Sequence, residues 1–336
     1  MSVSGLRASR IAVTIHRLLA VGFTVGLCVG SAAAAAQTYP NKPVHLVVPF
    51  AAGGAVDLIG RTFAQKVTEI WKQQVIVDNK AGAGGNIGAD AVAKATPDGY
   101  TLLINISGQA ISAALYRKLP FDPVKDFTPV TQLTSTYLIL VANTKVPANS
   151  VKELVALAKS RPGKLNYGST GIGASPHLAG ELLKSVAGID VVHVPYKGDA
   201  PLTPALLADE VQFGFLPLSS VLQHIQAGKL RALGVTGAKR GASVPDVPTF
   251  IEAGLPEFEY SGWIGIFAPG GMPRDLAHKI GADFVKALNQ PEVLALLPGW
   301  GYEPVGGTPE QFAAKYQADI GFYTRIIREA KVPLVD

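Results

Sequence analysis

The sequence has little charge and almost no cysteine. Only 16% of its 336 residues are Asp, Glu, Lys or Arg, below the roughly 25% of an average soluble chain. Its one cysteine, Cys28, excludes a disulfide scaffold. A hydrophobic content of 48% supplies enough apolar side chains for a large core, so disorder is excluded as well.

The first 36 residues have the pattern of a secretory signal peptide. Arginines precede an apolar run over residues 18–30, and a series of alanines ends at Ala36. The run is too short for a membrane span, which needs roughly 20 apolar residues. We expect Sec-type export, cleavage after Ala36 and a periplasmic product. Cys28 follows Leu27, where a lipoprotein signal has a smaller residue, so a lipid anchor is the less favoured alternative.

Cleavage would remove most of the formal net charge of +5. The remaining 300 residues keep 27 basic and 25 acidic side chains, a net charge of +2, and no cysteine. A nucleic-acid binder needs a basic surface that displaces counterions from phosphates. Nucleic acid is therefore excluded as a partner, and thiol catalysis is excluded in the exported chain.

Short β-branched runs alternate with helical patterns after the signal, which is typical of parallel sheets covered by helices. The expected strands are 44–50, 74–79, 100–106, 165–169, 190–196, 212–218 and 231–236. The expected helices are 56–71, 87–94, 151–159, 178–186, 221–227, 274–288, 292–297 and 309–330. A capping box at Ser150-Val-Lys-Glu153 and a cap at Thr308 predict where two of these helices begin.

The strand–helix series occurs twice, over residues 44–110 and 150–237. Extended runs at 128–143 and 263–268 would carry the chain from one series to the other and back. This order predicts two α/β lobes with a hinge between them. Lobe 1 would contain residues 37–141 and 262–336, and lobe 2 residues 142–261. A single continuous α/β domain is the alternative.

Glycine-rich turns follow several of the expected strands and open the next helix. They are Pro49–Asp57, Ala81–Gly88 and Tyr167–Pro176. Glycine lets a backbone approach a ligand closely, and the first N–H groups of a helix have no partner within the helix, so such turns bind anions. Each helix start stabilises a negative group by roughly 0.3–1 kcal/mol. Several starts together can hold a carboxylate without arginine, although each turn alone has a purely structural alternative.

Known motifs for nucleotides, metals and catalysis are not met. The run 82–88 has three residues instead of two between its second and last glycine, and no P-loop occurs. The histidines lack metal-ligand spacing, so neither metal nor cofactor is expected. For His177 and His193 a structural role is the favoured interpretation. The alternative function is an exported α/β hydrolase acting on a carboxylic ester through Ser169, His193 and Asp199.

Segments along nearly the whole exported chain resemble the Bug-type, TctC-like receptors of tripartite tricarboxylate transporters. They are residues 39–57, 77–102, 167–181, 194–198, 244–255 and 263–273. The resemblance implies an α/β fold, the two-lobed type II periplasmic binding protein or Venus flytrap, with two parallel-rich sheets. It implies a monomeric receptor, not an enzyme. The receptor would capture a small organic carboxylate, a di- or tricarboxylate or an aromatic acid, and deliver it to an inner-membrane permease.

The resemblance also implies which residues contact the ligand. Main-chain groups and ordered water of lobe 1 would hold one carboxylate, and lobe 2 would set substrate choice. The expected residues are Phe50, Ala51, Gly53, Gly54, Asp57, Gly84, Gly85, Asn86 and Ser107 in lobe 1, and Ser169, Thr170, His177, Tyr196 and Asp199 in lobe 2. At Ala51-Ala52 relatives often have proline, so this turn departs from the family pattern.

A side chain at residue 85 should block the approach of a ligand to the backbone. We expect Gly85→Val to abolish carboxylate binding, whereas Ser169→Ala should weaken or redirect it. Calorimetry on the folded variants measures both effects. Normal binding by Gly85→Val would contradict the placement of the shared carboxylate in lobe 1.

Overall fold

The computed structural model describes residues 39–336, so the signal peptide and its cleavage after Ala36 lie outside the described residues. Residues 42–336 form one compact α/β unit. Its strands join into a 10-stranded sheet in the order β2-β1-β3-β9-β4-β7-β5-β6, with β8 and β10 paired to β4. None of the helices in this described part has the length and apolarity that a bilayer span requires.

One end of the sheet is parallel, as expected. It consists of β2 (Val75–Asn79), β1 (Val44–Val48) and β3 (Thr101–Ile106). The helices that follow these strands are α2 (Ala55–Trp71), α3 (Asn86–Ala93) and α4 (Gly108–Leu115). Strand β1 is buried at four of its five positions, which explains its nearly continuous apolar sequence. The strands therefore deliver their helix starts to one edge of the sheet.

The other end of the sheet is a second parallel set. It consists of β7 (Phe213–Pro217), β5 (Asn166–Ser169) and β6 (Val192–Pro195). Its helices are α5 (Val151–Ser160), α6 (Ser175–Ala187), α7 (Asp199–Ala208) and α8 (Leu218–Gln226). Strand β8 (Leu230–Val235), expected within a parallel sheet, instead pairs antiparallel with β4.

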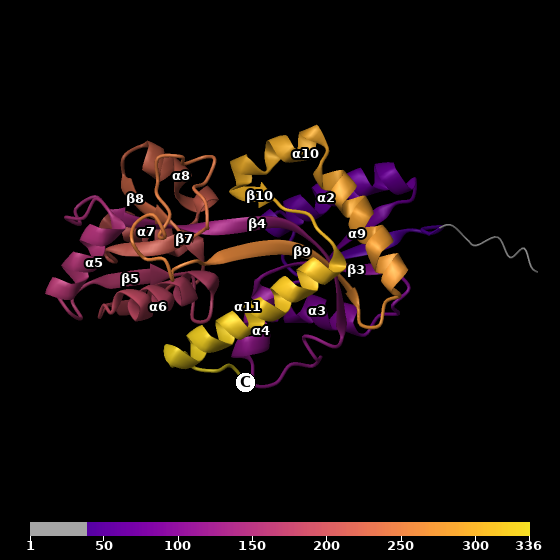
Figure 1. The fold of residues 1–336 in the computed structure, drawn as a ribbon, viewed down its shortest axis with the longest axis horizontal. Helices are drawn as coiled ribbons and strands as arrows, with labels where there is room; N and C mark the ends of the chain where they lie inside the picture. The colour runs from indigo at the N-terminus through magenta and orange to yellow at the C-terminus, as the bar shows by residue number, and fades with distance from the viewer. Residues whose placement is uncertain (1–38) are drawn as a thin grey trace, which may run out of the picture. The chain divides into compact units, whose positions relative to one another are not determined.

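Two long antiparallel strands join these parallel sets. Residues 127–137 of β4 (Phe127–Asn143) pair with β9 (Ser261–Pro269), whereas residues 138–143 pair with β7 and β8. Figure 1 shows β4 and β9 running between the helices α5 to α8 at one end and α2, α3 and α9 at the other. The two parallel sets expected from the sequence are thus connected through a shared antiparallel centre.

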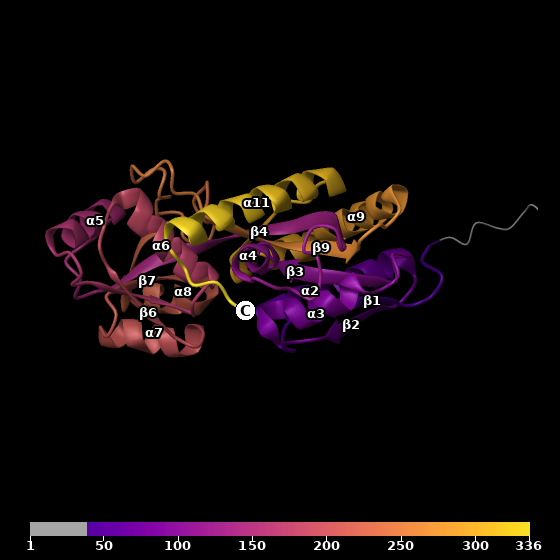
Figure 2. The same ribbon diagram turned by 90° about the horizontal axis from the view of Figure 1, so that it is seen from below.

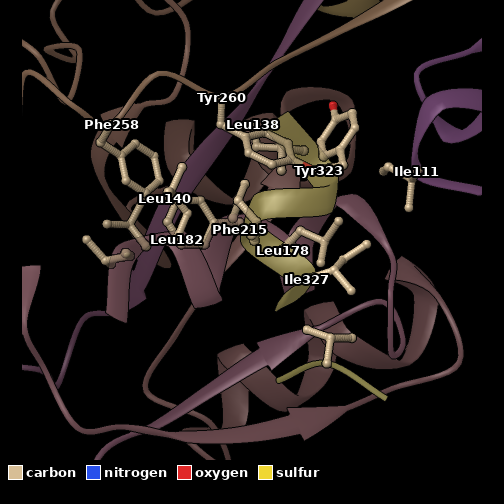
Figure 3. Close-up of a cluster of buried hydrophobic side chains, with 14 of the residues drawn as sticks. Ile111, Leu138, Leu140, Leu178, Leu182, Phe215, Phe258, Tyr260, Tyr323 and Ile327 are labelled. Atoms are coloured by element: carbon tan, nitrogen blue, oxygen red, sulfur yellow. The ribbon is translucent and has the colours of Figure 1, made fainter. Parts of the chain in front are cut away.

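The carboxyl-terminal segment completes the unit and packs on helices that follow strands of both sets. It contains α9 (Arg274–Leu288), α10 (Pro291–Leu296), β10 (Tyr302–Pro304) and α11 (Pro309–Glu329). Helix α11 packs on β4, α4 and α6, and Figure 2 shows it lying along β4. Its residues Tyr323 and Ile327 pack in one buried cluster with Ile111 of α4 and Leu178 of α6 (Figure 3).

Some elements were not expected from the sequence. Helix α7 contains Pro201 and Pro204, residues that indicate a turn. Its Leu202 and Leu206 are nevertheless fully buried, because tertiary packing outweighs the poor helix propensity. Helix α4 opens on a glycine, the 3-10 helices η1 (Ala83–Gly85) and η2 (Pro298–Trp300) are very short, and β10 is a three-residue strand on β4.

The cap at Thr308 is confirmed, and the capping box expected at Ser150 forms only in its Ser150 half. The Thr308 hydroxyl accepts from the Gln311 N–H at 3.3 Å, and the Gln311 side chain accepts from the Thr308 N–H at 2.8 Å. The Ser150 hydroxyl accepts from the Glu153 N–H at 3.1 Å. The Glu153 carboxylate accepts from the N–H of Asn149 instead of Ser150, at 2.7 Å.

Helix α11 depends on its cap because it begins on the surface. We expect Thr308→Ala to lower the free energy of unfolding by about 1 kcal/mol, since it leaves a helix-start amide without its partner. Denaturant unfolding measures the loss. The control is Thr324→Ala, which removes an exposed hydroxyl bonded to the Ile320 carbonyl within the same helix. An equal effect of both variants would show that the cap contributes nothing specific.

Candidate functional site

A cavity of about 490 Å³ is lined by residues from both strand sets and from β4 and β9 between them. This volume falls within the range of roughly 300–1,000 Å³ that small-molecule sites occupy. Its wall includes Ser107, at the start of α4, and Thr170, directly after β5. Among the described lining residues, Asp199 alone carries a formal charge, and no Lys, Arg or His contributes. Most of the wall is apolar.

Several helix starts border this cavity. The lining residues include Val56 of α2, Gly108 of α4, Ser175 of α6, Asp199 of α7 and Pro217, which precedes α8. No described side chain caps any of these helices. The first amides of an uncapped helix carry a partial positive charge and need a hydrogen-bond acceptor. The cavity therefore favours an anion although its wall has no cation.

The turn before α3 brings main chain to the cavity. Residues 82–85 all have positive φ values, and Gly84, at φ +66°, lines the cavity. Gly85 is buried behind it: a Cβ there would lie 3.5 Å from the Phe50 ring and 3.6 Å from Pro49. Its φ of +100° disfavours other residues as well. Asn86 is buried as the first residue of α3.

Asp57 organises the turn before α2. Its carboxylate accepts from the Gly53 N–H at 2.8 Å, from Arg61 Nε at 2.9 Å and from Asn79 Nδ2 at 2.9 Å. Burial opposes ionisation, but hydrogen bonds from Arg61, Gly53 and Asn79 outweigh it and hold the pKa of Asp57 below its ordinary value. Neither Asp57 nor Phe50, Ala51, Gly53 or Gly54 is among the lining residues. This side chain fixes the turn from behind.

Residues that the sequence interpretation did not assign to the site form another part of the wall. Ser175 and Tyr260 both line the cavity, and their hydroxyls lie 2.9 Å apart. Tyr260 also packs edge to face against Tyr323, with ring centroids 5.8 Å apart. Burial raises the pKa of both tyrosines, so they stay neutral donors. The sequence pointed to Ser175 through the glycine-rich turn that contains it, and it pointed to none of the others.

Trp263 lines the cavity and is anchored from behind. Its Nε1 donates to the buried Asp319 carboxylate at 2.7 Å, and Lys315 donates to the same carboxylate at 2.6 Å. Both partners belong to α11. The indole is therefore held in one position, and its fluorescence can report on the cavity.

In the second strand set, Thr170 and Asp199 line the cavity, whereas Ser169, His177 and Tyr196 do not. The fully buried Ser169 hydroxyl lies 2.6 Å from His193 Nε2. Asp199 accepts instead from Ser220, at 2.8 Å. The triad of the hydrolase alternative is therefore not assembled. Ligand contact by Ser169, His177 and Tyr196 stays a prediction from the resemblance.

The buried His177 and the half-buried His193 hold the turn after β5. His177 Nδ1 accepts from the Gly173 N–H at 3.0 Å, and the His177 and His193 rings stack with centroids 4.0 Å apart. Glu181 lies 3.9 Å from His177 Nε2 and is bonded by Tyr167 and Lys184. Since Gly173 lines the cavity, the histidines shape its wall without reaching it.

The remaining acidic and histidine side chains offer no metal site. Within residues 39–336, no group of three or more His, Cys, Asp or Glu is placed to hold a metal ion.

The sequence is similar to a known receptor family. The family model described as "Tripartite tricarboxylate transporter family receptor" matches residues 59–332. The UPF0065 protein of the tcbD-tcbE intergenic region in Pseudomonas sp. strain P51 is 40% identical over 301 residues, 88% of each chain. Protein BugT of Bordetella pertussis is 35% identical over 321 residues, 95% of this chain and 98% of BugT.

Solved structures agree in fold. A protein of R. palustris in complex with adipate has a TM-score of 0.76 and 34% identity, covering 88% of this chain and all of that one. MatC of Rhodopseudomonas palustris, with bound malate, has a TM-score of 0.70 and 32% identity, covering 86% of this chain and all of MatC. The periplasmic binding protein fold expected from the sequence is thereby confirmed.

The histidine cluster should make stability depend on pH. Burial lowers the pKa of both rings from the ordinary 6.5, and that of His193, which His177 lowers further, to about 4. The unfolded chain binds protons in this window before the folded chain does, so the free energy of unfolding should fall as pH drops from 6.5 towards 4. In urea unfolding across that range, the free energy of unfolding of His193→Gln should fall less than that of the unmodified protein.

The matched control is His224→Gln, which replaces a histidine on α8 outside the cluster. It should keep the pH dependence of the unmodified protein. If the free energy of unfolding depended on pH equally in His193→Gln and in the unmodified protein, the claim that the stacked histidines are neutral would be refuted.

Proposed function

We propose that this chain captures a small organic carboxylate in the periplasm. The premise is that the chain belongs to the tripartite tricarboxylate transporter receptor family. The family consists of periplasmic solute receptors and not of enzymes. The chain would deliver its ligand to a cognate inner-membrane permease. It would act as a monomer after removal of residues 1–36.

One observation carries this proposal: a cavity bordered by uncapped helix starts has no basic side chain among its described lining residues. A helix start contributes about 0.3–1 kcal/mol towards an anion, and up to about 2 kcal/mol when partly buried. Main-chain amides and the hydroxyls of Ser107 and Thr170 together supply enough donors for one carboxylate. The apolar wall suits a hydrocarbon body attached to it.

The position of the cavity supports capture between two lobes. Its lining residues come from both parallel strand sets, and among the described strands the pairing of β4 with β9 connects these sets. The lobes would be residues 37–141 with 262–336, and residues 142–261, with β4 and β9 as the hinge. A ligand that touches both sides favours the closed arrangement, because it binds that arrangement more tightly.

The residues assigned to the ligand differ in their proposed roles. Gly84, Ser107, Thr170 and Asp199, which line the cavity, would contact the ligand. The others would shape the turns that carry these contacts or bind through water. They are Phe50, Ala51, Gly53, Gly54, Asp57, Gly85, Asn86, Ser169, His177 and Tyr196.

Relatives give the range of acids to test. One structural relative was solved with adipate and another with malate. For this chain we propose a di- or tricarboxylate or an aromatic acid, since each combines a carboxylate with a body that an apolar cavity of this volume accommodates.

A thermal-shift screen of such acids tests the proposal. At a free concentration 100 times the Kd, a ligand stabilises the folded chain by about 2.7 kcal/mol, so at least one acid should raise the melting temperature clearly. The methyl ester of that acid serves as a control and should have little effect, since it lacks the anion. A screen in which no acid raises the melting temperature, or turnover of one at enzyme-like rates, would contradict the proposed function.

A further inference from the structure

The cavity contains a carboxylate of the protein itself. Asp199 is the first residue of α7 and is half-buried in the cavity wall. Its Oδ2 accepts a hydrogen bond of 2.8 Å from the hydroxyl of Ser220, which lies in the first turn of α8. Its Oδ1 accepts no hydrogen bond from any described residue. Asp199 thus provides an unused acceptor on the wall.

At the second strand set, the carboxylate of Asp199 lies where a bound anion would otherwise be favoured. The starts of α7 and α8, with their partial positive charge, lie next to it, and an acidic residue at a helix start is stabilised by that charge. Burial raises the pKa of Asp199, and the hydrogen bond from Ser220 opposes this increase. A resident anion therefore already satisfies the anion preference of these helix starts.

The first strand set has no such group in the wall, because Asp57, in the first turn of α2, is paired with Arg61 and is not among the lining residues. Its described lining residues around Gly84, Ser107 and Gly108 include no acidic side chain. A ligand carboxylate is therefore favoured at this side. A second ligand carboxylate at the other side would meet Asp199, and no described Lys, Arg or His in the wall would offset the repulsion.

We propose that Asp199 selects ligands in which the end remote from the bound carboxylate carries a hydrogen-bond donor, a hydroxyl or an amine. Such a donor pairs with the carboxylate of Asp199, whereas a second ligand carboxylate is disfavoured. This inference rests on the proposed function and narrows it to hydroxy and amino acids over dicarboxylates of the same length.

Matched acids separate the donor from the rest of the ligand. A straight-chain series consists of glutarate, gamma-hydroxybutyrate, gamma-aminobutyrate and valerate, which share one spacer. An aromatic series consists of terephthalate, para-hydroxybenzoate, para-aminobenzoate and para-toluate. Calorimetry or Trp263 fluorescence gives the Kd of each. In the series that fits the cavity, the hydroxyl and amine members should bind at least tenfold more tightly than the dicarboxylate.

The substitution Asp199→Asn removes the charge at constant size. It should bring the ratio of the Kd values of the dicarboxylate and the donor-bearing acids close to one, because the donor-bearing acids then bind more weakly and the dicarboxylate binds more tightly. Glu210→Gln is the matched control, because it removes an exposed negative charge just beyond the end of the same helix, and it should keep the ratio. If Asp199→Asn fails to fold, Asp199→Ser, a residue that suits helix starts, replaces it.

The possible outcomes distinguish this inference from the proposed function. If dicarboxylates bind best and Asp199→Asn leaves the ratio unchanged, the role of Asp199 is refuted while the receptor function stands. If no member of either series or of the wider acid screen binds, the proposed function fails and this inference fails with it.

Discussion

Unpaired amides at helix starts are the constraint on which this structure depends. A buried N–H without an acceptor is costly, and the starts of α2, α4 and α6 around the cavity have no side-chain cap to supply one. The topology creates this situation, since parallel strands lead their helices to the same edge of a sheet. The antiparallel pair β4 and β9 then connects one such edge to another. An anionic ligand is the natural acceptor between them.

Buried polar groups behind the wall hold this arrangement in place. Asp57 fixes the turn before α2, His177 holds the turn after β5 at Gly173, and Asp319 anchors the indole of Trp263. None of these side chains is among the lining residues. Their hydrogen bonds fix the positions of backbone and aromatic groups that do line the cavity, so the donors are preorganised before a ligand arrives.

Pattern and spacing predict the elements better than they predict the direction of a side chain. The start of α5 at its Ser150 cap and the bounds of α9 match the expected ones, because these signals are local. Helix α7 escapes prediction, since only tertiary burial of Leu202 and Leu206 explains a helix with internal proline. Likewise Ser169 and Thr170 are neighbours in one turn, yet only Thr170 lines the cavity. Tyr260, which is far from Ser107 in the sequence, has no local signal at all.

The most direct test is a crystal structure of the mature chain with the acid that binds most tightly. We expect the ligand carboxylate within about 3.2 Å of main-chain N–H groups at the turns around Gly84 and Gly108, with no Lys, Arg or His side chain in contact. A carboxylate held by a basic side chain, or bound away from these helix starts, would contradict the central claim.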